Sequence, residues 1–225
     1  HVLYGHIAGT AAYSVGHWLR DIRPHLSGAP IIVGGTGLYF SALTEGLADI
    51  PPTPPEVREH AINRISSEGV SGLLAELDAA TSERIDIQNP VRVQRAWEVL
   101  KATGKGLATW QDETAPPLLP LRDAQGFVLN APKAWLNPRI AMRFDQMLNS
   151  GAIEEAQRNA AHWSPEQPSA KAIGAAELIA HVRGEMSLED VKTSVKIKTR
   201  QYAKRQRSWF RARMADWQWI EAEGL

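Results

Sequence analysis

The sequence predicts an α/β fold that carries a small inserted helical domain. The apolar run Ile31–Val33 is bounded by proline and glycine and leads into a glycine-rich turn and a helix, which is typical of a buried strand. Phe127–Leu129 is a second short strand of the same kind. Residues 51–118 show only helical patterns and have prolines at both ends. We therefore expect a core domain made of residues 1–50 and 119–225, with residues 51–118 inserted between its two parts.

The first part of the core is expected to hold one helix before the apolar run. Ser14 is a favourable N-cap, and Val15, Trp18 and Ile22 follow it at helical spacing. A proline and a Ser-Gly pair then end this helix.

The insertion begins at Pro51–Pro55, where four prolines in five residues exclude a helix or a central strand and favour an extended backbone. Helical patterns follow over 56–68 and around Leu73–Leu77. A third helix starts at Asn89–Pro90, an N-cap followed by proline at the first helical position, and it ends near Gly104.

The second part of the core is expected to be mainly helical. One helix starts at Asn137–Pro138, which repeats the combination of cap and proline. A further helix opens within Lys171–Glu177, and the last long helix follows Ser187. The apolar face of the first of these helices holds Ile140, Phe144, Met147 and Leu148.

The turn after the first strand is a candidate anion site. Gly34, Gly35 and Gly37 surround Thr36 just before a helix, so free backbone N–H groups and the positive end of the helix dipole point at one spot. The Thr36 hydroxyl can donate one more hydrogen bond to a phosphate oxygen. The alternative is that these glycines only make a tight turn between strand and helix.

Two arginines are candidates for the same anion. Arg139 and Arg143 lie four residues apart and therefore share one side of their helix, separate from its apolar face. The helix can pack on the core and still point both guanidinium groups into a cleft.

A cationic stripe runs along the last long helix. Between Lys192 and Arg213 there are nine Lys or Arg residues and no acid. Like charges four residues apart repel one another unless an anion neutralises them, so the stripe favours binding of a polyphosphate or an RNA backbone over a merely solvated helix face. Six of these residues stay within an arc of about 120°: Lys192, Lys196, Arg200, Lys204, Arg207 and Arg211.

Composition narrows the class of protein. The chain has 225 residues, 44% of them hydrophobic and 22% charged, which is typical of a globular domain with a sizeable core. The absence of Cys excludes disulfides and thiolate metal sites, and the seven His residues show no ligand spacing. No apolar run is long enough to cross a membrane, and no signal peptide opens the chain. We expect a monomeric, cytoplasmic protein with no membrane partner.

Five motifs, in this order, resemble bacterial tRNA dimethylallyltransferases, also called tRNA isopentenyltransferases. The resemblance covers nearly the whole chain, and its last motif is the most specific. The motifs are Gly34–Phe40, Glu45–Leu47, Arg92–Glu98, Arg139–Ile140 with Arg143–Phe144, and Thr199–Gln206.

The resemblance implies a parallel-sheet core of the P-loop NTPase kind, with a helical insertion that clasps the anticodon stem-loop of tRNA. It implies transfer of a dimethylallyl group from dimethylallyl diphosphate to N6 of the adenosine just 3′ of the anticodon, with Mg²⁺ as cofactor and with nucleotide (ATP) binding as a family property.

The resemblance also implies roles for individual residues. Thr36 would lie where the two substrates meet, close to the bridging oxygen of the diphosphate, and Arg143 would bind the diphosphate; both would be catalytic. Together with the analysis of the turn and the arginine pair, the diphosphate set is Gly34, Gly35, Thr36, Gly37, Arg139 and Arg143. Together with the stripe, the tRNA set is Thr36, Arg58, Val91, Arg92, Val93, Gln94, Arg95, Lys171, Ala172, Ile173, Gly174, Arg200, Lys204 and Arg207.

The sequence departs from the family in two places. Gly174-Ala175-Ala176 stands where the family usually has Gly-Tyr and a basic residue. The family's N-terminal P-loop and the aspartate that acts as general base are not in this sequence, which begins at His1. We therefore expect a chain whose N-terminal part is absent and which transfers no dimethylallyl group alone. The alternatives are a transferase acting on free adenine nucleotide, which would need neither insertion nor stripe, and a non-catalytic RNA-binding protein. A histidine metalloenzyme is less favoured, because the His residues show no ligand spacing.

Overall fold

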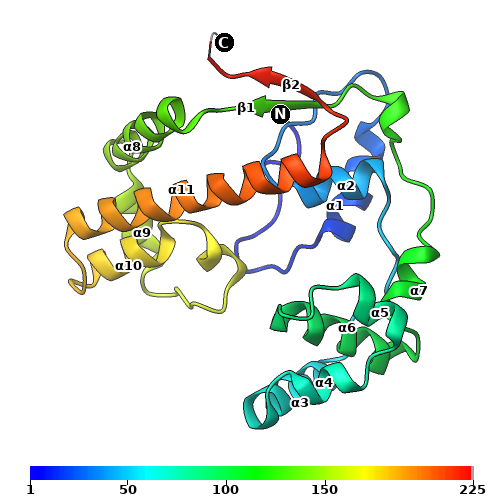
Figure 1. Cartoon of the computed structure of the whole chain (residues 1–225). Helices are drawn as coiled ribbons and strands as arrows, with labels where there is room; N and C mark the ends of the chain where they lie inside the picture. The colour runs from blue at the N-terminus through cyan, green and yellow to red at the C-terminus, as the bar shows by residue number, and fades with distance from the viewer. Residues whose placement is uncertain (224–225) are drawn as a thin grey trace. The chain divides into compact units, whose positions relative to one another are not determined.

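The structure, a computed structural model, describes residues 1–223. It divides into two compact units (Figure 1): unit 1, formed by His1–Ser41 and Leu121–Leu225, and unit 2, formed by Ala42–Pro120. The chain therefore leaves unit 1 within a helix, ahead of the prolines where the sequence predicts the boundary. Within residues 1–223, no helix combines the length and the apolar character needed to cross a membrane.

Unit 1 consists of helices around a two-stranded parallel sheet. In chain order its elements are α1 (Val15–Ile22), the short 3-10 helix η1 (Arg23–His25), the first turns of α2 (Gly37–Thr44), η2 (Leu121–Asp123), β1 (Phe127–Asn130), α8 (Lys133–Asn149), α9 (Ala152–Asn159), η3 (Pro168–Lys171), α10 (Ala175–Val182), α11 (Leu188–Arg213) and β2 (Gln218–Glu221). The remainder of α2 belongs to unit 2.

The sheet pairs β1 with β2 in parallel, from Phe127 opposite Gln218 to Asn130 opposite Glu221. Helices α8 to α11 make the crossover, as parallel strands require. The α/β class is therefore confirmed in a mainly helical form. A P-loop core is not shown, because the sheet has two strands within the part of the chain that is described.

The main apolar core of unit 1 lies between α8, α9, α10 and α11. Phe144 of α8 and Val191 and Val195 of α11 are almost completely buried there, together with Leu178 and Ile179 of α10. Removal of this much apolar surface from water is the main force that fixes α8 against the N-terminal half of α11.

The predicted strand at Ile31–Val33 is wrong. The segment is not a strand, and Ile31 and Val33 are 91% and 72% exposed. An apolar run becomes a buried strand only where another strand satisfies its N–H and C=O groups. Within residues 1–223, no strand pairs with this segment.

Helix α8 starts earlier than its sequence predicts. It begins at Lys133 after Pro132, and Pro138 lies inside it rather than at its first position. Ile140 and Phe144 are buried as predicted. Met147, on the same face by helical spacing, is 42% exposed and is not buried as predicted.

Unit 2 is a helical module. Its elements, after the end of α2, are α3 (Pro55–Glu68), α4 (Ser71–Ala75), α5 (Ala79–Arg84), α6 (Pro90–Thr103) and α7 (Leu107–Asp112). Asn89 caps α6 by accepting from the N–H groups of Val91 and Arg92. The core holds Ala61, Leu73, Val93 and Trp97, each with at most 1% exposure.

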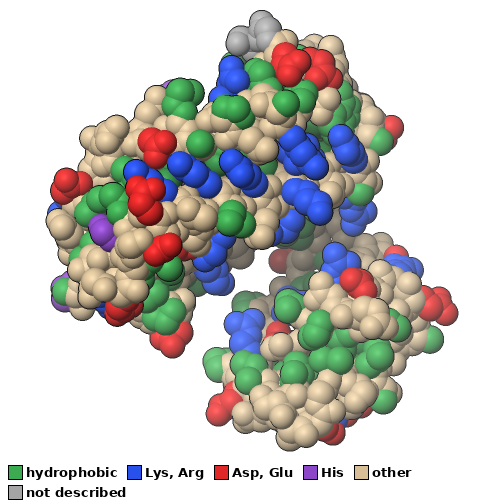
Figure 2. Space-filling model, turned by 60° about the vertical axis from the view of Figure 1, so that its left-hand side comes forward, with side chains coloured by type: hydrophobic (Ala, Val, Ile, Leu, Met, Phe, Trp, Pro, Cys, Tyr) green, Lys and Arg blue, Asp and Glu red, His purple; other side chains and the backbone are tan. Residues whose placement is uncertain are grey.

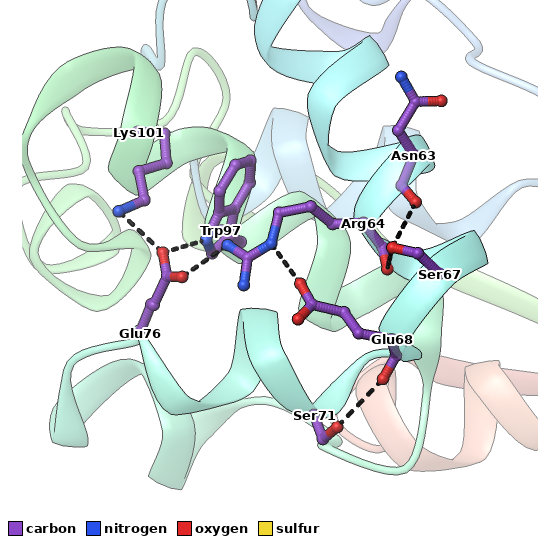
Figure 3. Close-up of polar contacts among 8 residues, drawn as sticks. All are labelled: Asn63, Arg64, Ser67, Glu68, Ser71, Glu76, Trp97 and Lys101. Atoms are coloured by element: carbon purple, nitrogen blue, oxygen red, sulfur yellow. Dashed lines mark hydrogen bonds and ion pairs between the residues drawn. The ribbon is translucent and has the colours of Figure 1, made fainter.

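A polar network surrounds Trp97 in unit 2 (Figure 3). The Glu76 carboxylate accepts from the Trp97 indole N–H at 2.8 Å and pairs with Lys101 at 2.8 Å and Arg64 at 2.5 Å. These three donors, with Lys101 the strongest, lower the pKa of Glu76 to about 2. Glu76 therefore links α4 to α3 and α6 as a carboxylate.

Candidate functional site

The glycine-rich turn of unit 1 is held against the C-terminal half of α11. The Gln206 side-chain amide donates to the Gly35 carbonyl at 2.6 Å. One helical turn earlier, the Tyr202 hydroxyl lies 3.4 Å from the Thr36 hydroxyl. Tyr202 and Gln206 are four residues apart, so α11 presents both to the turn from one face.

Gly37 is required by this packing. A Cβ atom added at Gly37 would lie 2.0 Å from the ring of Trp209 on α11, which no real contact allows. Trp209 is one turn beyond Gln206 on α11. The first residue of α2 therefore has to be glycine for the start of α2 to approach α11 this closely.

The contact with Gln206 also orients the next peptide N–H. The Gly35 carbonyl points at Gln206, and the peptide that follows is trans. The Thr36 N–H therefore points away from α11. Because α2 starts at Gly37, the N–H groups of Gly37 and Leu38 lie at the positive end of the helix dipole, whereas the Tyr39 N–H donates to the Thr36 carbonyl at 3.1 Å.

A shallow pocket of about 200 Å³ opens at this turn. At about 30 Å³ per water molecule, it has the size of a small anion or a short chain rather than of a whole nucleotide. One wall is polar backbone and the other is apolar and aromatic. The lining residues are Trp18, Ile32, Val33, Gly34, Gly35, Thr36, Tyr39 and Phe40.

The pocket does not fit a protein-bound Mg²⁺ ion. Mg²⁺ prefers carboxylate oxygens in near-octahedral geometry. No carboxylate lines the pocket. Among residues 1–223, no three His, Asp or Glu side chains are grouped closely enough to hold a metal ion. The residues that line the pocket therefore do not fit the Mg²⁺ that the resemblance implies.

Arg143 lies on α8, beside the part of α11 that precedes the turn. Its neighbour Phe144 packs in the same core as Val195, whereas Thr36 contacts Tyr202. The seven residues from Val195 to Tyr202 correspond to about 10 Å along the helix axis. Arg143 does not line the pocket at Thr36, but it is exposed, and no carboxylate of residues 1–223 pairs with it.

Arg139 is engaged by its own helix. Its guanidinium lies 3.6 Å from the centre of the Trp135 ring and donates to the Trp135 carbonyl at 3.2 Å. A cation stacked on an aromatic face in this way keeps its charge but loses freedom to reach a ligand. Of the two predicted arginines, Arg143 is therefore the one that is free to approach a diphosphate.

The cationic stripe on α11 divides into two halves. Lys192 pairs with Glu189 at 3.2 Å, and Lys196 pairs with Asp145 at 3.6 Å. Lys198 pairs at 2.5 Å with the buried Glu177. The lack of neutralising acids that the sequence predicts therefore does not hold for the N-terminal half of α11.

The C-terminal half of α11 keeps its positive charge. Among residues 1–223, no acid pairs with Arg200, Lys204 or Arg207. A groove of about 560 Å³ runs along this half of α11, and Figure 2 shows Lys and Arg side chains gathered across one face of the unit that carries this helix. The groove is lined by Gln201, Lys204, Arg205, Ser208 and Trp209.

The residues of unit 2 predicted to contact tRNA divide by burial. Val91 is 73% exposed, and Arg92 beside it is exposed at the start of α6. Val93 is fully buried in the core of unit 2, so its side chain is not part of the surface that Val91 and Arg92 present, and its contact with tRNA stays a prediction. Helix periodicity explains this, because Val93 faces the same side as Trp97.

The other members of that set, Arg58, Gln94 and Arg95, meet at a buried carboxylate. Arg58 of α3 and Arg95 of α6 approach Glu98 to 3.7 and 3.9 Å. The Gln94 amide donates to the same carboxylate at 2.9 Å.

In unit 1, the segment before α10 divides by burial in the same way. Lys171, Ala172 and Ile173 are exposed, as a contact to a ligand requires. Gly174 is buried, with φ +97° and Val195 at its back, which the turn into α10 requires, and its contact with tRNA stays a prediction.

Sequence reasoning missed three residues of the site: Tyr202, Gln206 and Trp209. Their signal was present, because they recur at spacings of four and three along α11 and so share a face. What the sequence alone could not show is that this face meets the glycine-rich turn, more than 160 residues earlier in the chain.

Comparison with known proteins finds similar sequences over nearly the whole chain. A tRNA dimethylallyltransferase of Cereibacter sphaeroides is 58% identical over 219 residues, covering 96% of this chain and 70% of the relative. One of Dinoroseobacter shibae is 57% identical over 221 residues, covering 96% of this chain and 74% of the relative.

Solved structures share the fold. A tRNA isopentenylpyrophosphate transferase of Bacillus halodurans is 28% identical, with a TM-score of 0.62 over 98% of this chain and 71% of that one. A eukaryotic dimethylallyltransferase acting on tRNA is 24% identical, with a TM-score of 0.76 over 97% and 59% of the two chains, and shows the fold alone. The model of the family described as IPP transferase matches residues 1–213. Together with relatives of such high identity, this match shows that the chain belongs to the IPP transferase family.

Proposed function

We propose that this protein transfers a dimethylallyl group from dimethylallyl diphosphate to N6 of the adenosine that follows the anticodon in tRNA. The observation that carries the proposal is that one element, the C-terminal half of α11, contacts the turn at Thr36 through Tyr202 and Gln206 and bears unpaired cations on another side of the same helix. A small anion site and an RNA-binding surface on the same helix bring a prenyl diphosphate and a nucleic acid together.

In the reaction, the bond between the allylic carbon and the diphosphate oxygen breaks and a bond from N6 to that carbon forms. The leaving diphosphate gains negative charge. The N–H groups of Thr36 and Gly37 would bind it, and Arg143 would reach it from α8. The aromatic wall formed by Trp18, Tyr39 and Phe40 suits the five-carbon chain and excludes water from it.

Thr36 has to be held in place for this chemistry. Its hydroxyl lies beside Tyr202, while Gln206 fixes the peptide that precedes it. A donor that is fixed before the substrate arrives pays no reorganisation cost when the charge develops. N6 loses one proton in the reaction. No carboxylate or imidazole lines the pocket, so the general-base aspartate that the resemblance implies, which is not in this sequence, would accept this proton.

The RNA has to deliver an unstacked base. Extruding a base costs a few kcal/mol, which contacts to the backbone of the loop can offset. The cations of Arg200, Lys204 and Arg207 supply such contacts, and the exposed residues at the start of α6 in unit 2 supply others. An anticodon loop suits this arrangement, because some of its bases are already splayed.

The proposal is tested by competition binding to the 225-residue chain. A labelled anticodon stem-loop with adenosine 3′ of the anticodon is titrated in a fluorescence anisotropy assay, with AMP and a duplex RNA of equal length as competitors. We expect binding of the stem-loop, weak competition by the duplex, and no competition by AMP up to millimolar concentration. Displacement of the stem-loop by micromolar AMP would instead indicate a transferase for free nucleotide, and equal affinity for stem-loop and duplex would indicate unspecific RNA binding.

A further inference from the structure

Unit 2 buries a carboxylate directly beneath two exposed arginines. The Glu98 side chain is 4% exposed, on α6. It approaches Arg58 of α3 to 3.7 Å and Arg95 of its own helix to 3.9 Å, and it accepts from the Gln94 amide at 2.9 Å. The side chains of Arg58 and Arg95 themselves remain 59% and 42% exposed.

This arrangement differs from an ordinary ion pair on a surface. Burying a carboxylate costs free energy, which the Gln94 amide offsets by a hydrogen bond and the two arginines offset by their charge. Each guanidinium has five N–H donors, and at 3.7 and 3.9 Å neither arginine donates a hydrogen bond to Glu98, so these donors remain available to a ligand. Arg95 also donates to Thr53 in the proline-rich segment at 2.5 Å, which restrains it further.

The charges do not cancel. Two guanidinium groups around one carboxylate leave a net positive charge at the surface, and the carboxylate is too buried to repel an incoming anion by contact. A flexible arginine loses side-chain entropy when it binds a phosphate, whereas one that is already held pays less. Glu98 therefore lies where it can restrain the side chains of Arg58 and Arg95, which belong to different helices, before an RNA binds.

We propose that Glu98 is a positioning residue that orients Arg58 and Arg95 for recognition of a folded RNA loop. This inference rests on the proposed function, because it assumes that the chain binds an anticodon stem-loop. Glu98 itself touches no RNA. It converts two mobile cations into a fixed pair of donors, so it contributes to selectivity for one RNA shape rather than to general attraction for RNA.

Glu76 provides a contrast within the same unit. It also binds two cations, but its partners surround the Trp97 ring and join three helices into the core (Figure 3). Neither Arg64 nor Lys101 belongs to the set predicted to contact tRNA. Two carboxylates of one small unit therefore serve separate purposes, and substitutions can tell them apart.

The test compares Glu98→Gln with the unchanged 225-residue chain in two binding assays. One uses the anticodon stem-loop and the other a single-stranded oligouridine of equal length. We expect stem-loop affinity to fall by about tenfold, the coupling found between side chains of one hydrogen-bond network. Affinity for oligouridine should stay equal or rise, because the substitution adds one unit of positive charge near the surface. The matched control is Glu113→Gln, which removes an exposed carboxylate paired with Lys105 in the same unit.

A thermodynamic cycle separates positioning from folding. Arg95→Ala should weaken stem-loop binding in the unchanged chain by several fold more than it does in the Glu98→Gln background. Equal effects in both backgrounds would overturn the inference, and so would a parallel loss of affinity for both RNAs. If the unchanged chain does not prefer the stem-loop over oligouridine, the proposed function is wrong. This result needs no variant, so it is distinguishable from a failure of the inference about Glu98.

Discussion

Arg139 and Arg143 look equivalent in the sequence, one helical turn apart on the same side of α8, but the structure gives them different surroundings. Arg139 is stacked on Trp135 and bonded to its carbonyl, whereas Arg143 is exposed and has no acid partner within residues 1–223. To reach a ligand, Arg139 would have to leave the Trp135 ring and break its hydrogen bond to the Trp135 carbonyl, whereas Arg143 has no such contact to break.

We therefore predict that Arg143→Ala weakens binding of inorganic pyrophosphate more than Arg139→Ala does. Arg143→Ala removes one charged donor and should reduce the affinity for pyrophosphate by about tenfold or more. Arg139→Ala removes the stacked arginine and should reduce this affinity about twofold. Isothermal titration of both variants measures this. Equal losses of affinity in the two variants would mean that Arg139 leaves the Trp135 ring when pyrophosphate binds. An unchanged affinity of Arg143→Ala would show that Arg143 does not bind the diphosphate.

Single residues show where sequence reasoning ended. Thr36 could be singled out because glycines flank it in an order that carries its own chemistry. Gln206 could not, because its role depends on a contact with Gly35, far away in the chain. Val93 belongs to the same motif as Val91 and Arg92 but is buried, because membership of a motif does not say which side of the helix faces the core.

At the scale of elements, the two halves of α11 have different roles. Its N-terminal half packs on α8 through Val191 and Val195 and pairs its lysines with acids. Its C-terminal half holds the turn at Thr36 and leaves its cations unpaired. The sequence showed the stripe, but it could not show that acids from other elements neutralise only half of it.

This division predicts the salt dependence of RNA binding. Replacing Arg200, Lys204 and Arg207 by alanine should reduce the slope of log affinity against log salt concentration by about 2, because each phosphate contact contributes about 0.7 on single strands. The matched control replaces Lys192 and Lys196, which should change the slope by less than about 0.5. If the control changes the slope as much as the triple variant, the two halves of α11 are equivalent toward RNA.

The start of α2 provides a second test at this scale. Gly37→Ala places a methyl group into the ring of Trp209, and we expect it to lower the free energy of unfolding by about 2 kcal/mol, the usual cost of overpacking. Gly34→Ala is the control, because its added Cβ would lie at an ordinary 3.5 Å from Phe40. Denaturant titration compares the two, and a fully stable Gly37→Ala protein would contradict the close packing of α2 on α11.

The strand predicted at Ile31–Val33 failed for a related reason. Ile31–Val33 has the hydrophobicity and the flanking residues that are typical of a strand. A strand forms only where its backbone pairs with another strand, and this pairing is not a local property of the sequence. Helices fared better, because their hydrogen bonds are internal and their caps are local: Ser14 and Asn89 begin helices as predicted.

At the scale of the whole molecule, unit 2 should be sensitive to acid through Glu76. Its pKa is lowered to about 2 in the folded protein, so the stabilisation is present above the ordinary carboxyl pKa and is lost as the pH falls from about 4.5 toward 2. We expect Glu76→Gln to lower the free energy of unfolding at pH 7 by about 1 kcal/mol. This value is small for hydrogen bonds to a charged group, because solvent partly screens the Glu76 carboxylate.

The measurement is calorimetric unfolding from pH 7 to pH 2.5. Below pH 4.5, the free energy of unfolding should fall less for the Glu76→Gln variant than for the unchanged chain. The two curves of unfolding free energy against pH should therefore converge in acid. The control is Glu59→Gln, an exposed acid on α3 outside the network around Trp97. Parallel curves for Glu76→Gln and the unchanged chain would mean that the network around Trp97 does not depend on this charge.

The central claim is that two surfaces, each on its own unit, contact the tRNA: the C-terminal half of α11 in unit 1 and the exposed start of α6 in unit 2. The most direct test is cross-linking of the chain to an anticodon stem-loop, followed by mass spectrometry of the linked peptides. We predict links within 200–211 and within 91–95, and none at Lys192 or Lys196. Links confined to the N-terminal half of α11, or the absence of links in unit 2, would contradict the account.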